Sequence, residues 1–266
     1  METDNNNNRS GRAALASETL AALAVGYYTL RDGRRIEIAA TLQQCVAGTK
    51  LVLPESLSLL VDAADATPRG FASTRIEVVN EPTLNGIRRL RQDSAASIAA
   101  LNFASAKNPG GGFLGGSQAQ EESLARSSGL YASLSAIPDY YEYHRAQGSA
   151  LYSDRVVWTP DCPIFRDDAG ALLDEPHSAA FLTCAAPNAG AVHQNAPEDT
   201  PLIAPTLRRR AECVLAVAAA EHCDQHEQAR EDADQADDGV QNREGMHRHS
   251  DDHDFAPFFV IDCRGG

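Results

Sequence analysis

The pattern of hydrophobic positions along the chain predicts helices and strands in alternation. In residues 83–93, the apolar side chains Leu84, Ile87 and Leu90 recur at helical spacing. Residues 98–104, IAALNFA, instead form a nearly continuous apolar run, which is typical of a strand buried on both faces. Strands that alternate with helices favour an α/β layered fold. We therefore expect a sheet packed between helices.

The other expected elements rest on the same two periodicities and on turn residues between them. We expect helices at residues 13–23, 83–93, 118–134 and 208–222. We expect strands at residues 35–40, 50–54, 75–80, 98–104, 156–158 and 178–185. The last helix is expected to line one face with Leu207, Ala211, Val214, Leu215 and Ala218.

Length and charge narrow the class of protein. A chain of 266 residues with 43% hydrophobic residues suits one large domain with a sizeable core. The net charge of −14 disfavours direct binding of nucleic acid, because such a surface repels polyanions at long range. The start lacks the apolar stretch of a secretory signal, and no run is long enough to span a membrane. We expect a soluble cytoplasmic protein without membrane contacts.

The composition changes sharply near residue 225. Residues 225–254 carry ten acidic and three basic side chains and almost nothing to bury, which predicts a disordered segment. The apolar string FAPFFVIDC follows, and nothing nearby indicates where it docks. We therefore divide the chain into a polar segment (1–12), a folded domain (13–224) and an atypical acidic tail (225–266).

Metal and thiol chemistry are not indicated. The six cysteines are scattered without a CxxC pair, so we interpret them as free, structural thiols. Cys184 has no histidine placed to act as its base, and we expect it to pack within a strand. His193 is expected at the surface. The string HRHSDDHD at residues 247–254 has ligand-type side chains, but its charged context argues against a specific metal site.

Three tyrosines close together in the sequence are considered as possible ligand contacts. Tyr140, Tyr141 and Tyr143 are candidates for stacking on an adenine base. An exposed helix turn is the simpler interpretation, and it is the one we adopt.

Residues 101–131, LNFASAKNPGGGFLGGSQAQEESLARSSGLY, are the segment most suited to chemistry. The expected strand leads into Gly110, Gly111 and Gly112, where the backbone can approach a ligand closely. The helix that follows offers unpaired N–H groups and a partial positive charge at its N-terminus. Together these features favour an anionic ligand such as a diphosphate.

A purely structural interpretation of this segment exists. Ser117 and Gln120 have the spacing of a capping box, in which each side chain satisfies a backbone donor of the other. Glu121 and Glu122 would then only complement the helix dipole.

The complete string changes this balance. GGG, seven residues and QEE resemble the signature of the poly(ADP-ribose) glycohydrolases, a macrodomain-derived family. The flanks NFASAKNPGGGFLGG and SLARSSGLY are similar to the shorter, bacterial-type members. RIEVVNEPTL, CPIFRDDAGALL, FLTCAAPN and RRRAECVLAVAAAEHC extend the resemblance over roughly residues 10–223. It implies a macrodomain-like mixed sheet between helices, with a helical N-terminal extension.

The resemblance also implies roles for individual residues. Glu122 matches the family's catalytic acid, which protonates the leaving 2′-oxygen of the ribose–ribose O-glycosidic bond. Glu121 matches the residue that orients the ribose hydroxyls. The substrate-binding positions are Asn102, Gly110, Gly111, Gly112, Phe113 and Gln120, of which Gln120 supports the two glutamates.

The same resemblance implies partners and a mode of action. The expected ligands are poly(ADP-ribose), ADP-ribose and poly(ADP-ribosyl)ated proteins. The polymer is expected to be cut mainly from its end. The enzyme is expected to be a monomer that acts in the DNA damage response. No cofactor and no metal are implied. A helix N-terminus lowers the pKa of a carboxyl group, whereas nearby negative charge raises it. Because Glu121 and the substrate diphosphate supply that negative charge together, we expect Glu122 to be protonated mainly in the complex.

One part of the family pattern is missing. Bacterial-type members continue after the helix matching residues 208–223 with a buried strand and a second glycine loop of GCGVF type, and no such string follows here. Either the tail is a frame-shifted reading, or the chain is a degenerate member with an incomplete core. Two alternatives to a glycohydrolase therefore stay open: an ADP-ribose-binding module with little or no catalysis, and a hydrolase of ADP-ribose attached to protein.

Overall fold

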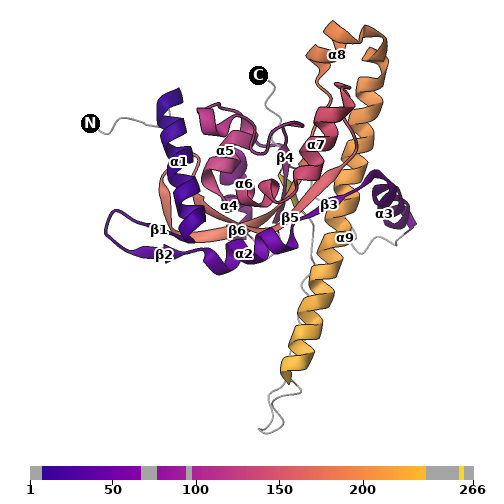
Figure 1. The fold of residues 1–266 in the computed structure, drawn as a ribbon. Helices are drawn as coiled ribbons and strands as arrows, with labels where there is room; N and C mark the ends of the chain where they lie inside the picture. Colours follow the sequence, from indigo (N-terminus) through magenta and orange to yellow (C-terminus); the bar gives the residue numbers. More distant parts are fainter. Residues whose placement is uncertain (1–7, 67–76, 94–97, 238–257, 261–266) are drawn as a thin grey trace.

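A central sheet lies between two layers of helices in the computed structural model of this chain (Figure 1). The structure describes residues 8–66, 77–93, 98–237 and 258–260. The α-helices are α1 (Arg9–Val25), α2 (Ala39–Gly48), α3 (Pro54–Ala66), α4 (Thr83–Asp93), α5 (Gln120–Ser127), α6 (Leu130–Ser135), α7 (Pro138–Gln147), α8 (Ala189–Asn195) and α9 (Ile203–Asp237). Two 3₁₀-helices are η1 (Phe113–Gly115) and η2 (Pro197–Leu202). The strands are β1 (Tyr27–Thr29), β2 (Arg35–Glu37), β3 (Lys50–Val52), β4 (Ile98–Phe103), β5 (Val156–Arg166), β6 (Leu172–Cys184) and β7 (Phe258–Val260).

The main sheet is mixed, as expected, with strand order β3-β5-β6-β4-β7. β4 runs parallel to both β6 and β7, whereas β5 is antiparallel to β3 and β6. The carboxyl ends of β4 and β6 therefore meet at one edge, the usual place of ligands in open α/β sheets. A separate hairpin pairs β1 with β2.

Each face of the sheet has its own hydrophobic core, because alternate residues of β4 point to opposite sides. Ile98 and Ala100 pack with α2, α4, α5, α6 and α7, in a cluster that includes Ile87 and Phe181. The opposite face packs against α3 and α9, with Val217 among its buried residues. This arrangement confirms the layered α/β fold.

Two expected elements are placed differently by the structure. Glu77–Asn80, the described part of the strand expected at residues 75–80, forms no strand, and Val78 is 89% exposed. Both edges of β4 are already paired, by β6 and β7, and Glu77 instead forms an ion pair with Arg89 of α4. The helix expected at residues 118–134 is split into α5 and α6, because Ser128 forms a β-bridge with Ile164 of β5.

Helix α9 is longer than expected and exposes a different face. α9 begins at Ile203 and continues to Asp237, where the expectation was residues 208–222 (Figure 1). Cys213, Val214 and Val217 form its buried stripe, whereas Leu207 and Leu215 are exposed, contrary to the expected face. The reason is that α3 and the sheet contact α9 from one side only.

The C-terminal apolar string has a place in the fold. β7 pairs in parallel with β4, with Ile98, Ala99 and Ala100 opposite Phe258, Phe259 and Val260. A strand therefore does follow α9 in the sheet, although no GCGVF-type sequence accompanies it. The division at residues 12 and 224 stays a prediction, and residues 238–257 lie outside the described part of the chain.

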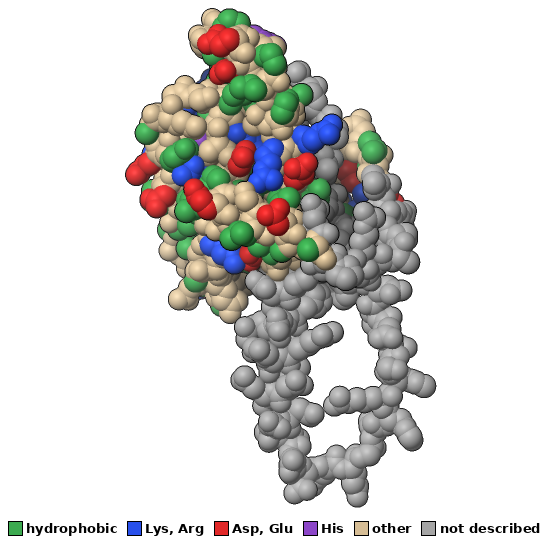
Figure 2. All heavy atoms as spheres, turned by 90° about the vertical axis from the view of Figure 1, so that its right-hand side faces the viewer, with side chains coloured by type: hydrophobic (Ala, Val, Ile, Leu, Met, Phe, Trp, Pro, Cys, Tyr) green, Lys and Arg blue, Asp and Glu red, His purple; other side chains and the backbone are tan. Residues whose placement is uncertain are grey.

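The described surface fits the charge analysis. Figure 2 shows basic side chains interspersed with acidic ones on the face displayed, without a continuous basic area. No helix within the described residues combines the length and apolar character needed to cross a bilayer.

Candidate active site

Gln120 joins the end of β4 to the start of α5. Its side-chain carbonyl accepts a hydrogen bond of 2.8 Å from the Phe103 N–H, and its amide donates to the Leu101 carbonyl at 2.7 Å. The amide also donates to Thr83 Oγ1 at 3.3 Å. The helix that carries the two glutamates is thus fixed to the strand that delivers the chain to the site.

Glu121 is the buried carboxyl group of the site, 3% exposed. Its Oε2 accepts a hydrogen bond of 2.6 Å from the Ser105 N–H, and Asn102 Nδ2 approaches Oε1 at 3.5 Å. Burial raises the pKa of Glu121 to about 7, against the lowering effect of the Ser105 and Asn102 hydrogen bonds. A carboxyl group that titrates near neutral pH is typical of an active site.

Glu122 lies next to the glycine loop and is partly exposed. Its Oε1 accepts a hydrogen bond of 3.0 Å from the Gly112 N–H. A Cβ at Gly111 would collide with that same oxygen, and Gly111 has a φ of +59°. The loop therefore needs glycine both for its backbone conformation and for its contact with the carboxylate.

The loop uses several of its N–H groups internally, contrary to the expectation that it presents them to a ligand. Gly111 N–H donates to the Asn108 carbonyl at 3.0 Å, and Phe113 N–H to the Gly110 carbonyl at 3.2 Å. The Gly112 N–H donates to the Glu122 carboxylate. The tight turns require these bonds, so what the loop presents at this point is the oriented Glu122 carboxylate.

The capping box is not formed. The N-cap of α5 is Ala119, which makes no side-chain cap, and Gln120 is occupied by β4. Ser117 lies against the loop instead, since a Cβ at Gly112 would be 2.5 Å from its Oγ. This arrangement excludes the capping-box interpretation of Ser117 and Gln120.

Asn102 and Phe113 are both fully buried. Asn102 Nδ2 donates to Thr183 Oγ1 of β6 at 3.1 Å, and its Oδ1 has no hydrogen-bond partner among the described residues. Phe113 packs in a small cluster with Ala16 and Ala125, beneath the loop. Asn102 is thus brought to Glu121, whereas the Phe113 ring supports the loop from the core.

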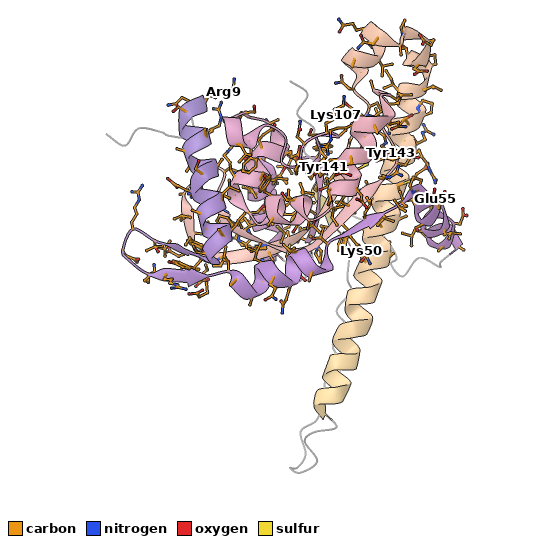
Figure 3. All side chains as sticks on the ribbon, viewed as in Figure 1. Arg9, Lys50, Glu55, Lys107, Tyr141 and Tyr143 are labelled. Carbon is orange, nitrogen blue, oxygen red and sulfur yellow. The ribbon has the colours of Figure 1, made fainter. Side chains whose placement is uncertain are left out.

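The tyrosines are placed differently from the expected exposed turn. Tyr140 and Tyr141 are buried, because the face of α7 that carries them packs on the sheet, and only Tyr143 is exposed. The Tyr140 hydroxyl accepts a hydrogen bond of 3.0 Å from the Ala185 N–H at the end of β6. Figure 3 shows Tyr141 and Tyr143 on α7, with Lys107 nearby and Lys50 apart from them.

Cys184 and His193 lie where the sequence interpretation expects them. Cys184 is buried, and burial raises the pKa of its thiol to about 12, which is unsuited to a nucleophile. His193 is exposed on α8. The four cysteines described, Cys45, Cys162, Cys184 and Cys213, are free. Within the described residues, no group of three or more His, Cys, Asp or Glu side chains is arranged to hold a metal ion, and residues 247–254 lie outside them.

Sequence reasoning missed the arginines that hold the loop. Arg126 on α5 is 3% exposed and donates to the Ser117 carbonyl at 2.8 Å and to the Gln118 side chain. Arg9 and Arg12 of α1 donate to the carbonyls of Gly115 and Gly116, each at 2.8 Å. No periodicity connects residues about a hundred positions apart, so only the structure reveals these contacts.

Comparison with known protein families gives a match that includes the glycine loop and both glutamates. The family described as microbial-type PARG, catalytic domain, matches residues 16–167. Among curated proteins, no match was found.

Solved structures extend the similarity beyond that range. A poly(ADP-ribose) glycohydrolase (PARG) from Thermomonospora curvata is 49% identical with a TM-score of 0.76, over 80% of this chain and 77% of that one. The same protein bound to the inhibitor ADP-HPD is 47% identical with a TM-score of 0.72, over 80% and 76% of the two chains. The enzyme from Deinococcus radiodurans in complex with ADP-ribose is 52% identical with a TM-score of 0.63, over 67% and 71%. This chain belongs to the microbial-type poly(ADP-ribose) glycohydrolase family.

Proposed function

We propose that this chain hydrolyses the ribose–ribose O-glycosidic bonds of poly(ADP-ribose) and releases ADP-ribose, mainly from the chain end. Family membership and the complexes of relatives with ADP-ribose and ADP-HPD support this reaction. The observation that carries the proposal is the hydrogen bond between the Glu122 carboxylate and the Gly112 N–H. It fixes one carboxyl group against the loop that would lie along the substrate.

In this proposal Glu122 is the general acid. Its proton goes to the 2′-oxygen of the leaving ribose, the C1″–O bond breaks, and an oxocarbenium-like centre forms at C1″. Water attacks this centre and loses a proton, which gives ADP-ribose with a free 1″-hydroxyl and the shortened polymer. General acid catalysis of this kind contributes roughly a hundredfold to ten-thousandfold in rate.

Glu121 and Asn102 would orient the terminal ribose. Both are held rigidly, Glu121 by the Ser105 N–H and Asn102 by Thr183. Asn102 Oδ1, which has no hydrogen-bond partner in the described part of the chain, and the Glu121 carboxylate are acceptors suited to ribose hydroxyls. The glycines of the loop let the diphosphate approach the backbone, while Gln120 and Phe113 act through the loop and strand that they hold.

Analysis of products separates this proposal from the two alternatives. The full-length chain is incubated with poly(ADP-ribosyl)ated and with mono(ADP-ribosyl)ated protein, and released nucleotides are resolved by chromatography. The proposal predicts ADP-ribose from the polymer, with the last protein-linked unit retained. Release from the mono-modified protein would indicate an adduct hydrolase, and tight ADP-ribose binding without release would indicate a binding module.

A further inference from the structure

Three consecutive carbonyl groups at the end of the glycine loop are each held by a different arginine. Arg9 Nε donates to the Gly115 carbonyl, Arg12 Nε to Gly116 and Arg126 Nη1 to Ser117, all at 2.8 Å. Hydrogen bonds from a guanidinium group are stronger than those between neutral groups, and its planar donors fix direction as well as distance.

The first turn of α1 lies directly against this part of the loop. The space that a Cβ would need at Gly116, whose φ is +72°, is filled by the backbone carbonyl of Arg9. Figure 3 shows Arg9 at the end of α1 that lies beside α5. Thr19, further along α1, is buried, and its hydroxyl donates a hydrogen bond of 2.5 Å to the Arg126 carbonyl. α1 is thus joined to both the loop and α5.

The held segment is connected to Glu122 through a short chain of backbone hydrogen bonds. The N–H groups of Gly115 and Ser117 donate to the Gly112 carbonyl at 3.1 and 3.2 Å. The Gly112 N–H in turn donates to the Glu122 carboxylate. A shift of residues 115–117 would therefore act on the Gly112 carbonyl and so displace Gly112, whose N–H orients the proposed catalytic acid.

We propose that Arg9, Arg12 and Arg126 are positioning residues for the catalytic acid, and that α1 contributes to catalysis through Arg9 and Arg12. The inference rests on the proposed function, in which Glu122 protonates the leaving oxygen. Their role is to keep the loop end in register with α5, so that the Gly112 N–H orients the Glu122 carboxylate. A misplacement of about 1 Å at a reacting group can cost roughly a hundredfold in rate.

The test uses the double variant Arg9→Met and Arg12→Met in the full-length chain. Methionine keeps an unbranched side chain of helix-compatible type but removes the donors. The matched control is Arg34→Met, because Arg34 is exposed on the β1–β2 hairpin, where it pairs with Asp32 of the hairpin and Asp174 of β6. We expect kcat for ADP-ribose release to fall roughly tenfold to a hundredfold in the double variant.

Four further measurements distinguish positioning from general destabilisation. The Kd for ADP-ribose should rise less than threefold and thermal unfolding should change little, while Arg12→Lys, which keeps one donor, should recover part of kcat. The Gly112 N–H should exchange with solvent faster in the double variant than in wild type or Arg34→Met. An unchanged kcat and unchanged Gly112 exchange would overturn the inference, as would equal losses of kcat, affinity and stability.

The exchange measurement also separates this inference from the proposed function. If the wild-type chain releases no ADP-ribose, the proposed function fails, yet faster Gly112 exchange in the double variant would still support the loop-holding role. If the wild-type chain is active and the double variant equals Arg34→Met in kcat and exchange, only the positioning inference fails.

Discussion

The carboxylate of Glu122 and the backbone N–H of Gly112, ten residues apart, are joined by a hydrogen bond of 3.0 Å. This single contact connects the glycine loop to the helix of the two glutamates. It explains why a run of glycines and the QEE string occur together in the sequence. The loop conformation and the orientation of the acid are one structural feature.

Replacement of Gly111 by alanine tests this connection. The Cβ would meet Glu122 Oε1, and an L-residue at a φ of +59° costs about 1–2 kcal/mol of stability. We expect kcat for ADP-ribose release to fall roughly a hundredfold. Gly148→Ala is the matched control, since Gly148 has a φ of +73° with nothing within 4 Å of its Cβ position. Urea unfolding of Gly148→Ala should show a similar loss of stability, while its kcat stays unchanged. Equal activity of the two variants would contradict the account.

Glu121 predicts a dependence of stability on pH. Its pKa is raised by burial from 4.5 to about 7, so the folded chain binds more protons than the unfolded chain between these values. The stabilising effect of the protonated group is complete below pH 4.5 and is lost as the pH rises through about 7. A shift of this size corresponds to a free energy on the order of 3 kcal/mol.

Glu121→Gln should remove that dependence. The amide oxygen still accepts from the Ser105 N–H, so the variant should gain stability relative to wild type between pH 5 and pH 8. Urea unfolding at several pH values measures this difference. Glu198→Gln, at an exposed position of η2, controls for the change in net charge. A constant difference between Glu121→Gln and wild type across the range would show that Glu121 is not the titrating group.

Gln120 should be intolerant of a change to glutamate. The new oxygen would face the Leu101 carbonyl, which loses its donor at 2.7 Å, while the Phe103 N–H keeps an acceptor. Leaving a buried group unsatisfied costs about 1–3 kcal/mol. Thermal unfolding of Gln120→Glu should reveal this loss, whereas Gln43→Glu, exposed on α2, should stay close to wild type. Similar unfolding temperatures for both variants would refute the proposed link between β4 and α5.

The two buried tyrosines offer a matched pair. Tyr140→Phe deprives the buried Ala185 N–H of its acceptor and should destabilise the chain by about 1–3 kcal/mol. Tyr141→Phe removes a hydroxyl that has no partner among the described residues, so its effect should be clearly smaller. Denaturant unfolding of both variants gives the comparison. A larger loss for Tyr141→Phe would mean that its hydroxyl has an unrecognised role.

The sequence best predicted the helices and strands whose structure is determined by their own spacing of apolar residues. α4 has the expected bounds, Thr83–Asp93, because its apolar residues repeat at helical spacing. β4 ends one residue before the expectation, and its apolar run packs into the cores on both faces of the sheet, although Phe103 at its end is exposed. The mixed sheet came from the family resemblance, and the structure confirms it.

Elements decided by distant partners could not be predicted in this way. Residues 77–80 have a strand-like composition, but β4 is already paired on both sides. The helix at residues 118–134 is interrupted because Ser128 pairs with a strand more than thirty residues later. Tyr140 was expected to be exposed because local sequence does not show that α7 packs on the sheet.

In the candidate site, too, some features could be predicted from the motif and others depend on tertiary contacts. The resemblance brought Glu121, Glu122 and the glycine loop together, and the structure places these residues in contact. Their individual roles stay predictions. The internal use of the loop N–H groups and the arginines that hold its end depend on tertiary contacts, which neither motif nor spacing contains.

The most direct test of the central claim is ADP-ribose release from poly(ADP-ribosyl)ated protein by the full-length chain, with Glu122→Gln measured alongside. The substitution removes the proton that the acid must deliver while keeping an oxygen that can accept from Gly112. The account predicts release by the wild-type chain and a loss of roughly a hundredfold or more in the variant. Equal release by the two proteins would contradict the assignment of Glu122 as the acid, and no release by the folded wild-type chain would contradict the proposed reaction itself.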